Sequence, residues 1–265
     1  MKKISLYGLI LAIFINLLPL GILHAQTSPD PLKVQTITDQ YPLQSISSRP
    51  DSITSEVKYF SDPFWTVGFQ ILGSFSSDGS LPELSFQVST DQNTWSAWRP
   101  VVIEKDDISA TEIQLDPQPL PFASHYLQYH LSLPTNDQLS SLKITVIDPT
   151  ANQANIASSK NTSTTADNSL DHLNIIKREE WGADESIMFW LDDMEHAQIK
   201  QIVVHHTATA NDSPLDSEAM LRSIYYYHTV ERAWGDIGYN YVIDQEGNIF
   251  EGRKGGLGVV AGHAF

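Results

Sequence analysis

Apolar and polar residues alternate along much of the first half of the chain, from about residue 57 to residue 148. In three runs an apolar side chain recurs at every second position, which is the period of a β-strand with one buried face. Clusters of Gly, Pro, Asp and Asn separate the runs, as turns separate strands. This pattern predicts an all-β domain over residues 57–148, most simply a sandwich of jelly-roll-like form. The apolar positions of the three runs are Leu84, Phe86 and Val88; Leu127, Tyr129, Leu131 and Leu133; and Leu142, Ile144 and Val146.

The pattern changes from Leu173 onward, where strand-like and helix-like segments follow one another. Residues 199–206, IKQIVVHH, are β-branched and apolar, which predicts a buried strand. Residues 212–234 hold capping residues followed by apolar positions spaced three and four apart, which predicts an amphipathic helix. Residues 237–253 indicate two strands joined by the turn DQEGN, in which Gly247 supplies a positive φ. This order predicts a second domain of the α/β class.

Three other segments lack either period. Residues 1–25 contain two lysines, a long apolar run and a small residue at Ala25, which is typical of a secretory signal peptide cleaved after that alanine. The alternative is an uncleaved anchor, since the apolar run approaches the roughly 20 residues that span a bilayer. Residues 26–56 are polar and contain several prolines, which predicts an extended lead-in. Residues 149–172 are rich in Ser, Thr, Asn and Ala, which predicts a linker.

Charge and cysteine content exclude several classes of partner. The 265 residues include 16 basic and 32 acidic side chains, a formal net charge of −16. A surface of this sign repels a phosphate backbone, so we expect no nucleic-acid partner. The chain has no cysteine, which excludes disulfides and thiolate metal ligands within it. We expect a monomer that is secreted, periplasmic or held in the cell envelope, with no membrane span once the signal peptide is cleaved.

Two adjacent histidines, His205 and His206, end the apolar run of the predicted strand. Successive side chains of a strand point to opposite faces, so at most one of the two can reach a given metal ion. Imidazole is a common metal ligand. Both residues could equally be structural histidines held by hydrogen bonds, and the run by itself does not decide between these interpretations.

Four segments, in this order and spacing, resemble the peptidoglycan recognition proteins and the related zinc-dependent N-acetylmuramoyl-L-alanine amidases, including the phage amidase lysozymes. The most specific of them contains WGDIGYNYVI. The resemblance implies that residues 173–265 are the N-terminal part of an amidase or peptidoglycan recognition domain of α/β fold, with a central mixed β-sheet. The four segments are IIKREEWGADES (175–186), IVVHHTAT (202–209), YYYHTVERAWGDIGYNYVIDQEGNIFEGR (225–253) and VVAGHA (259–264).

The resemblance also implies roles for individual residues. It implies that His205 binds Zn²⁺, that Tyr239 lies beside the metal as a catalytic residue, and that His228 and His263 line the substrate groove. For Tyr239 the alternative is a core aromatic, and for His228 a buried histidine that joins helix to sheet. Arg253 could bind the acidic peptide stem of a substrate, or be an exposed loop arginine.

Hydrolytic zinc sites use three protein ligands and keep one position for water. In the similar proteins the second and third ligands come far after the Gly-His-Ala segment, so we expect this chain to be a C-terminally truncated fragment that ends at Phe265, inactive by itself. A rival arrangement would be a three-histidine site of His205, His228 and His263.

The expected function of the full-length protein is zinc-dependent hydrolysis of the amide between N-acetylmuramic acid and L-alanine in bacterial peptidoglycan. One alternative is a peptidoglycan-binding module without catalysis. Another is a cell-wall adhesin that acts through the β-domain, where Trp95 and Trp98 either stack on sugar rings or pack within the fold.

Overall fold

The structure is a computed structural model, and it describes most of the chain in several ranges. The signal segment predicted for residues 1–25, most of the predicted linker and His263 lie outside these ranges. The described residues are 32–41, 52–76, 80–103, 108–150, 173–189, 194–207, 209 and 213–262. Among them, no helix is both long and apolar enough to cross a bilayer.

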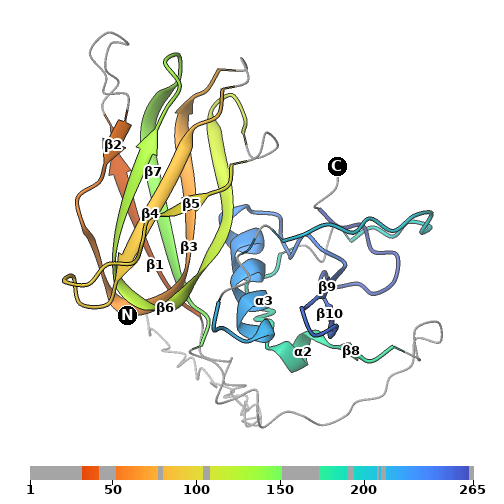
Figure 1. The fold of residues 1–265 in the computed structure, drawn as a ribbon. Helices are drawn as coiled ribbons and strands as arrows, with labels where there is room; N and C mark the ends of the chain where they lie inside the picture. Colours follow the sequence, from red (N-terminus) through yellow and green to blue (C-terminus); the bar gives the residue numbers. More distant parts are fainter. Residues whose placement is uncertain are drawn as a thin grey trace, which may run out of the picture.

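The first half of the chain forms an antiparallel sheet of seven strands in the order β1-β7-β3-β6-β4-β5, with β2 paired to β6 (Figure 1). This confirms the predicted β character of this half. The strands are β1 (Lys33–Gln40), β2 (Ser52–Thr54), β3 (Lys58–Ser74), β4 (Glu83–Ser89), β5 (Arg99–Val101), β6 (Glu112–Ser132) and β7 (Gln138–Asp148).

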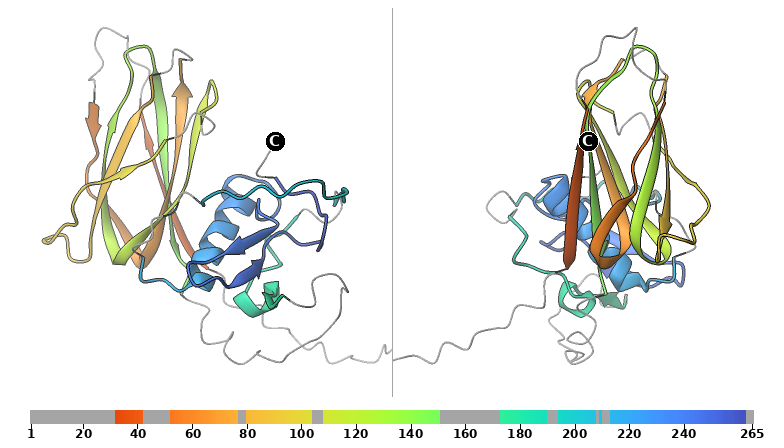
Figure 2. Two further views of the ribbon diagram at one scale, coloured as in Figure 1. Left: turned by 45° about the vertical axis from the view of Figure 1, so that its right-hand side comes forward. Right: turned by 90° about the vertical axis from the view of Figure 1, so that its left-hand side faces the viewer.

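The sheet folds over itself because β3 and β6 are long and irregular. Their pairing shifts register between Tyr59 and Phe64 and again between Val67 and Phe69, which bends both strands. Figure 2 shows the result as two facing layers of strands. A large apolar core, which includes Phe69, Leu115 and Ile144, fills the space between them. The jelly-roll topology itself stays a prediction.

Two strands lie in the region expected to be an extended lead-in, residues 26–56. Lys33–Gln40 pairs along its whole length with β7, and Ser52–Thr54 pairs with β6. Val34 and Ile37 do not fall on one face, so the period of two is missing from β1. This edge strand is held by main-chain pairing, a contribution that side-chain pattern does not reveal.

The second half contains a small mixed sheet and a helix. In the order β8-β10-β9, β8 (Ile175–Ile176) runs parallel to β10 (Ile249–Glu251), and β9 (Tyr241–Ile243) runs antiparallel to it. The short helix α2 (Arg178–Trp181) follows β8, and α3 (Ser217–Tyr226) continues into a π-helix, η4 (Tyr227–Glu231). A second apolar cluster, centred on Trp181, Tyr225 and Phe250, joins these elements.

Local chemistry explains the predicted helix and hairpin, which are both confirmed. Asp216 precedes α3 and its carboxylate accepts a hydrogen bond of 2.7 Å from the amide of Ala219, which caps the helix. Leu221 and Ile224, one turn apart, are both buried. Gly247 has a φ of 85° in the turn between β9 and β10, as the sequence requires.

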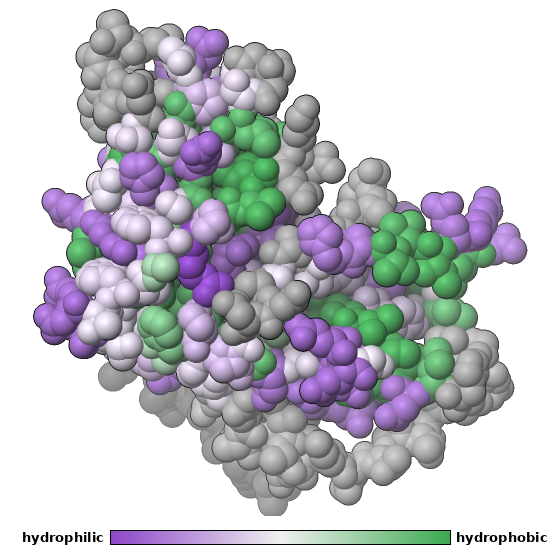
Figure 3. All heavy atoms as spheres, in the orientation of Figure 1, coloured by the Kyte–Doolittle hydropathy of each residue, from purple (hydrophilic) through white to green (hydrophobic). Residues whose placement is uncertain are grey.

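The predicted buried strand at residues 199–206 is wrong for the described structure. No strand is assigned there, and Ile202 and Val204 are each 85% exposed. The run contributes to an apolar surface at the right of Figure 3. A β-branched sequence favours an extended backbone, but a strand also needs a neighbour for its amide and carbonyl groups. Among the described residues, none pairs with this run as a strand.

The helical part of the second half packs against the outer face of the β-sheet. Tyr227 donates its hydroxyl to the carbonyl of Phe69 at 3.2 Å, and the hydroxyls of Thr66 and Ser223 lie 3.2 Å apart. Thr66 points outward from β3 because its neighbour Val67 fills the core on the opposite face. Arg222 on α3 also donates to the carbonyl of Pro149 after β7. The two halves therefore share a buried polar interface.

Candidate functional site

The structure brings three of the predicted site residues together in one aromatic cluster. The ring centroids of His205 and Tyr239 lie 5.4 Å apart, and those of His228 and Tyr239 lie 5.2 Å apart. The ring centroids of Trp234 and His228 lie 4.6 Å apart, and the two rings are tilted by 41°. These rings come from the 199–206 segment, from η4 and from the loop before β9. Tyr239 is the central member.

His205 presents its ring in a form suited to metal binding. Its Nδ1 lies 2.7 Å from the main-chain carbonyl of His206. Because a carbonyl only accepts hydrogen bonds, Nδ1 carries the hydrogen, and Nε2 of the neutral ring keeps its lone pair. Imidazoles that bind zinc commonly use this arrangement, in which the second nitrogen is held by an acceptor. The His205 side chain is exposed.

His228 is fully buried, which favours the structural alternative over a groove-lining role. The amide of Gly238 donates to its Nδ1 at 3.2 Å, so the neutral ring carries its hydrogen on Nε2. That nitrogen faces the Asp116 carboxylate at 3.7 Å. Burial lowers the pKa of His228, and Asp116 opposes this effect. A neutral His228 with Nδ1 already bonded to an amide is poorly suited to the rival three-histidine metal site, whose third member, His263, lies outside the described residues.

Tyr239 is 8% exposed and sits between the two histidines. Burial raises the pKa of its phenol; Asp116 raises it further and Arg232 lowers it. The phenol is therefore protonated near neutral pH and remains a hydrogen-bond donor. Tyr239 also belongs to the second apolar cluster, as the core alternative expects, and its catalytic role stays a prediction.

A buried carboxylate organises the loop that carries Tyr239. Asp236 accepts hydrogen bonds from the amides of Ile237 and Lys254, at 2.7 and 2.8 Å. Its Oδ1 also lies 3.0 Å from Nη1 of Arg178, whose side chain is nearly as buried. The loop between η4 and β9 is thereby tied to α2 and to the residues after β10.

Arg253 is buried and supports the loop that bears Tyr239. It is 3% exposed and donates to the carbonyls of Ile237 and Trp234, at 3.3 and 3.4 Å. Its guanidinium therefore braces the loop that bears Tyr239. Burial also lowers its pKa. The alternative of an exposed loop arginine is therefore wrong, and binding of a peptide stem by Arg253 stays a prediction.

The described residues contain no complete metal site around His205. No group of three or more His, Cys, Asp or Glu side chains there is arranged to hold a metal ion. His205 therefore fits zinc as a single ligand, through its tautomer and exposure, and the described residues supply no complete ligand set.

Two hollows lie outside the aromatic cluster. One, of about 480 Å³, opens between α3 and the β9–β10 hairpin, with an apolar floor that includes Met220, Val242 and Phe250 and acidic residues such as Asp216 and Asp244 at its edge. None of the three clustered ring residues lines it.

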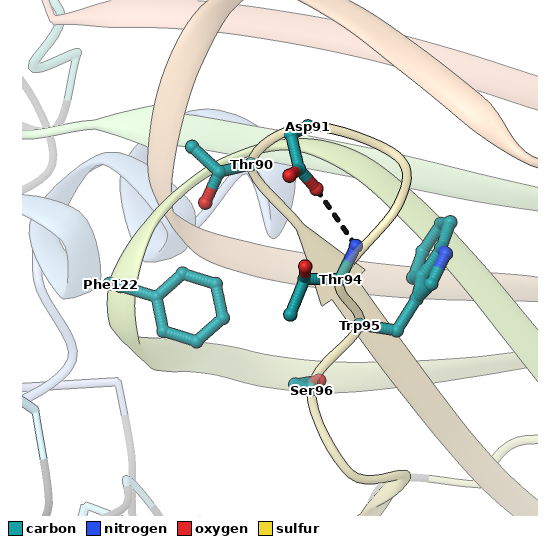
Figure 4. A pocket seen from close by; sticks show the side chains of 6 residues that line it. All are labelled: Thr90, Asp91, Thr94, Trp95, Ser96 and Phe122. Carbon is teal, nitrogen blue, oxygen red and sulfur yellow. Dashed lines mark hydrogen bonds between the residues drawn. The ribbon is translucent and has the colours of Figure 1, made fainter.

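The other hollow, of about 310 Å³, lies on the β-domain beside Trp95 (Figure 4). Phe122 and Trp95 stand on opposite sides of Thr94, whose amide donates to Asp91 at 2.8 Å. The indole N–H of Trp95 donates to the carbonyl of Gln92 at 3.1 Å, so this side chain holds its own loop. That bond favours packing over sugar stacking for Trp95. Trp98 is 42% exposed beside His130.

Sequence reasoning missed two carboxylates, Asp116 and Asp236. Asp236 lies within the specific WGDIGYN segment, and its position beside Gly235 was the available signal. Asp116 lies on β6 in the other half of the chain, where nothing local marks it as part of a site. The sequence cannot show this pairing because it depends on how the two halves pack.

Comparisons with known proteins agree with the resemblance. Peptidoglycan recognition protein 1 of Bos taurus is 32% identical over 80 residues, which is 30% of this chain and 40% of that protein. Peptidoglycan-recognition protein SC1a of Drosophila melanogaster is 31% identical over 80 residues, covering 30% and 42%. Peptidoglycan-recognition protein SC2 of Drosophila simulans is 32% identical over 93 residues, covering 35% and 48%. These similarities support a relationship to the peptidoglycan recognition protein and amidase family.

The chain spans less than half the length of these relatives. No protein-family model matches it. Among solved structures, the infectious bursal disease virus VP2 subviral particle aligns with a TM-score of 0.32 at 14% identity, over 47% of this chain and 34% of that one. A TM-score this low does not indicate a common fold.

Proposed function

We propose that the protein is a secreted or envelope-bound amidase that hydrolyses the N-acetylmuramoyl-L-alanine bond of bacterial peptidoglycan with the help of zinc. One observation carries the proposal: the ring of His205, whose Nδ1 is bonded to the His206 carbonyl, lies 5.4 Å from the ring of Tyr239, a buried and protonated phenol. The names of the similar proteins add support, since they point to peptidoglycan as the ligand.

His205 would supply one of the three protein ligands. The hydrogen bond from its Nδ1 to the His206 carbonyl fixes the ring and directs Nε2 away from that carbonyl. When bound, zinc supplies Lewis acidity and an activated water. The described residues hold no complete group of three such ligands.

Tyr239 would donate a hydrogen bond to the carbonyl oxygen of the scissile amide as negative charge develops there. Its raised pKa keeps the proton on the phenol at neutral pH, so it acts as a donor and not as a base. Loss of one such donor typically costs about two to three orders of magnitude in rate. His228 packs against the Tyr239 ring and limits the orientations open to it.

The test is hydrolysis of purified peptidoglycan by the full-length protein, with and without a zinc chelator. The release of free L-alanine amino groups measures the reaction. We expect activity that the chelator removes and zinc restores. His205→Ala should abolish it, and Tyr239→Phe should lower it by about two to three orders of magnitude. His206→Ala, which changes the neighbouring histidine, is the matched control and should retain activity. Full activity in His205→Ala or after complete zinc removal would disprove the proposal.

A second candidate is a peptidoglycan-binding protein without catalysis, which the word recognition in the names of the relatives favours. In this case the protein sediments with purified peptidoglycan, and neither His205→Ala nor a chelator changes the amount bound. No free L-alanine amino groups appear. The hydrolysis and sedimentation measurements together separate the two candidates.

A further inference from the structure

The outer face of strand β6 presents two polar groups to the helical half of the protein. Ile113 and Leu115 are buried in the core of the β-domain. Because side chains alternate along a strand, Gln114 and Asp116 lie on the opposite face. Arg232, just after η4, donates to the carbonyl of Gln114 at 2.9 Å and to the carboxylate of Asp116 at 3.3 Å. The Asp116 carboxylate of the β-domain therefore lies at the end of η4.

That carboxylate also faces the buried histidine of the candidate site. Oδ1 of Asp116 lies 3.7 Å from Nε2 of His228, and the Asp116 side chain is only 15% exposed. Since Gly238 donates to Nδ1, Nε2 is the nitrogen that carries the hydrogen. Asp116 is thus placed to attract that N–H and to fix the orientation of the ring.

The same ion pair supports His228 from a second side. The guanidinium of Arg232 lies 4.9 Å from the ring centroid of Trp234, and the ring centroids of Trp234 and His228 lie 4.6 Å apart with the rings tilted by 41°. Asp116 holds Arg232 in this place. The imidazole therefore faces Asp116 through Nε2 and packs against Trp234, whose neighbour Arg232 is paired with the same carboxylate of the β-domain.

We propose that Asp116 is a positioning residue of the candidate site, through which the β-domain sets the orientation of His228 and, by contact, of Tyr239. A continuous series of contacts leads from Asp116 to His228, then to Tyr239 and to His205. This inference rests on the proposed function for its effect on substrate. It makes the β-domain a structural part of the site and not a separate binding module.

The simpler reading is that Asp116 only joins the two halves through its ion pair with Arg232. Lys143 and Glu231 provide the comparison. Their ion pair, at 2.5 Å, links β7 to η4 across the same interface, and neither residue is among the ring contacts of His228. Lys143→Met therefore removes an interface ion pair without removing a group that faces the imidazole.

The test compares Asp116→Asn with Lys143→Met in the full chain, by NMR of ¹⁵N-labelled histidines. In Asp116→Asn we expect the two nitrogen signals of His228 to shift, because the ring loses the charge that favours a hydrogen on Nε2. Lys143→Met should leave these signals as in the wild type. His228 signals that are unchanged in folded Asp116→Asn would overturn the proposal. Should Asp116→Asn unfold, Asp116→Glu moves the carboxylate by one methylene and is judged by the same two outcomes.

The second measurement is the affinity for purified peptidoglycan, obtained by sedimentation. We expect Asp116→Asn to lower the affinity about tenfold, as loss of an orienting partner typically does, and Lys143→Met to leave it within about twofold. An equal loss in both variants would reduce Asp116 to an interface residue and overturn its positioning role. Failure of the wild type to bind peptidoglycan would instead count against the proposed function, while the His228 signals would still decide the role of Asp116.

Discussion

Gly68 on β3 lies directly against the aromatic ring of Tyr227 on η4. A methyl group at this position would overlap the ring, and Tyr227 is fully buried and cannot move aside. Gly68→Ala should therefore lower the free energy of unfolding by about 1–3 kcal/mol, as overpacking typically does. Urea unfolding followed by circular dichroism measures the change.

A double-mutant cycle separates this steric contact from a change in strand propensity. Tyr227→Leu shortens the side chain that Gly68 meets, so Gly68→Ala should cost much less in that background. An equal cost of Gly68→Ala with Tyr227 and with Leu at position 227 would show that the clash does not account for the loss.

The buried pair of Asp236 and Arg178 should be costly to break. Asp236→Asn leaves the Arg178 guanidinium in a buried site with a neutral partner, and we expect a loss of about 3–5 kcal/mol in the free energy of unfolding. Glu185→Gln is the control, because Glu185 also pairs with Arg178, but its side chain is 40% exposed. Its loss should stay below about 1 kcal/mol. Comparable losses in the two variants would contradict the role given to Asp236.

Elements with local signals were predictable from the sequence. Asp216 caps α3, and Gly247 supplies the turn of the β9–β10 hairpin, so both elements were expected where they occur. The pairing of β1 was not expected, because an edge strand needs no alternating face. The strand predicted for residues 199–206 was wrong for the opposite reason. The composition of this run suits a strand, but strand pairing depends on other segments.

The site was predictable only where a motif marked it. The resemblance suggested that His205 and Tyr239 lie together, and their rings are 5.4 Å apart. It gave no indication of Asp116, which is 116 positions from its partner Arg232. Arg253 shows a further limit, since an arginine in a polar loop looks exposed until the carbonyls around it are known.

Arg253 provides a test of its inward role. Arg253→Lys keeps the charge, but a single ammonium group cannot replace the two guanidinium nitrogens that donate to the carbonyls of Ile237 and Trp234. We expect a loss of about 1–3 kcal/mol in the free energy of unfolding, since buried carbonyls lose their donors. The melting temperature should fall, and at a temperature where the variant is folded its peptidoglycan affinity should approach that of the wild type. A large loss of affinity with unchanged melting would restore Arg253 as a substrate-binding residue.

Buried tyrosines should make the protein sensitive to alkali. Burial raises the pKa of Tyr227, and it also raises the pKa of Tyr225, where Arg178 acts in the opposite direction. In the unfolded chain these phenols ionise near their ordinary pKa of about 10. Above this pH the unfolded state binds fewer protons than the folded state, so the free energy of unfolding falls as pH rises, by about 1.4 kcal/mol per pH unit for each such tyrosine. The contribution of these tyrosines to stability is fully present below pH 10.

Urea unfolding between about pH 8 and 11 measures how steeply the free energy of unfolding falls with pH. This slope should be shallower in Tyr227→Phe by one proton. Tyr59→Phe, at a tyrosine that is 59% exposed, controls for the substitution itself. An unchanged slope in Tyr227→Phe would show that the buried phenol of Tyr227 is not a source of the alkaline instability.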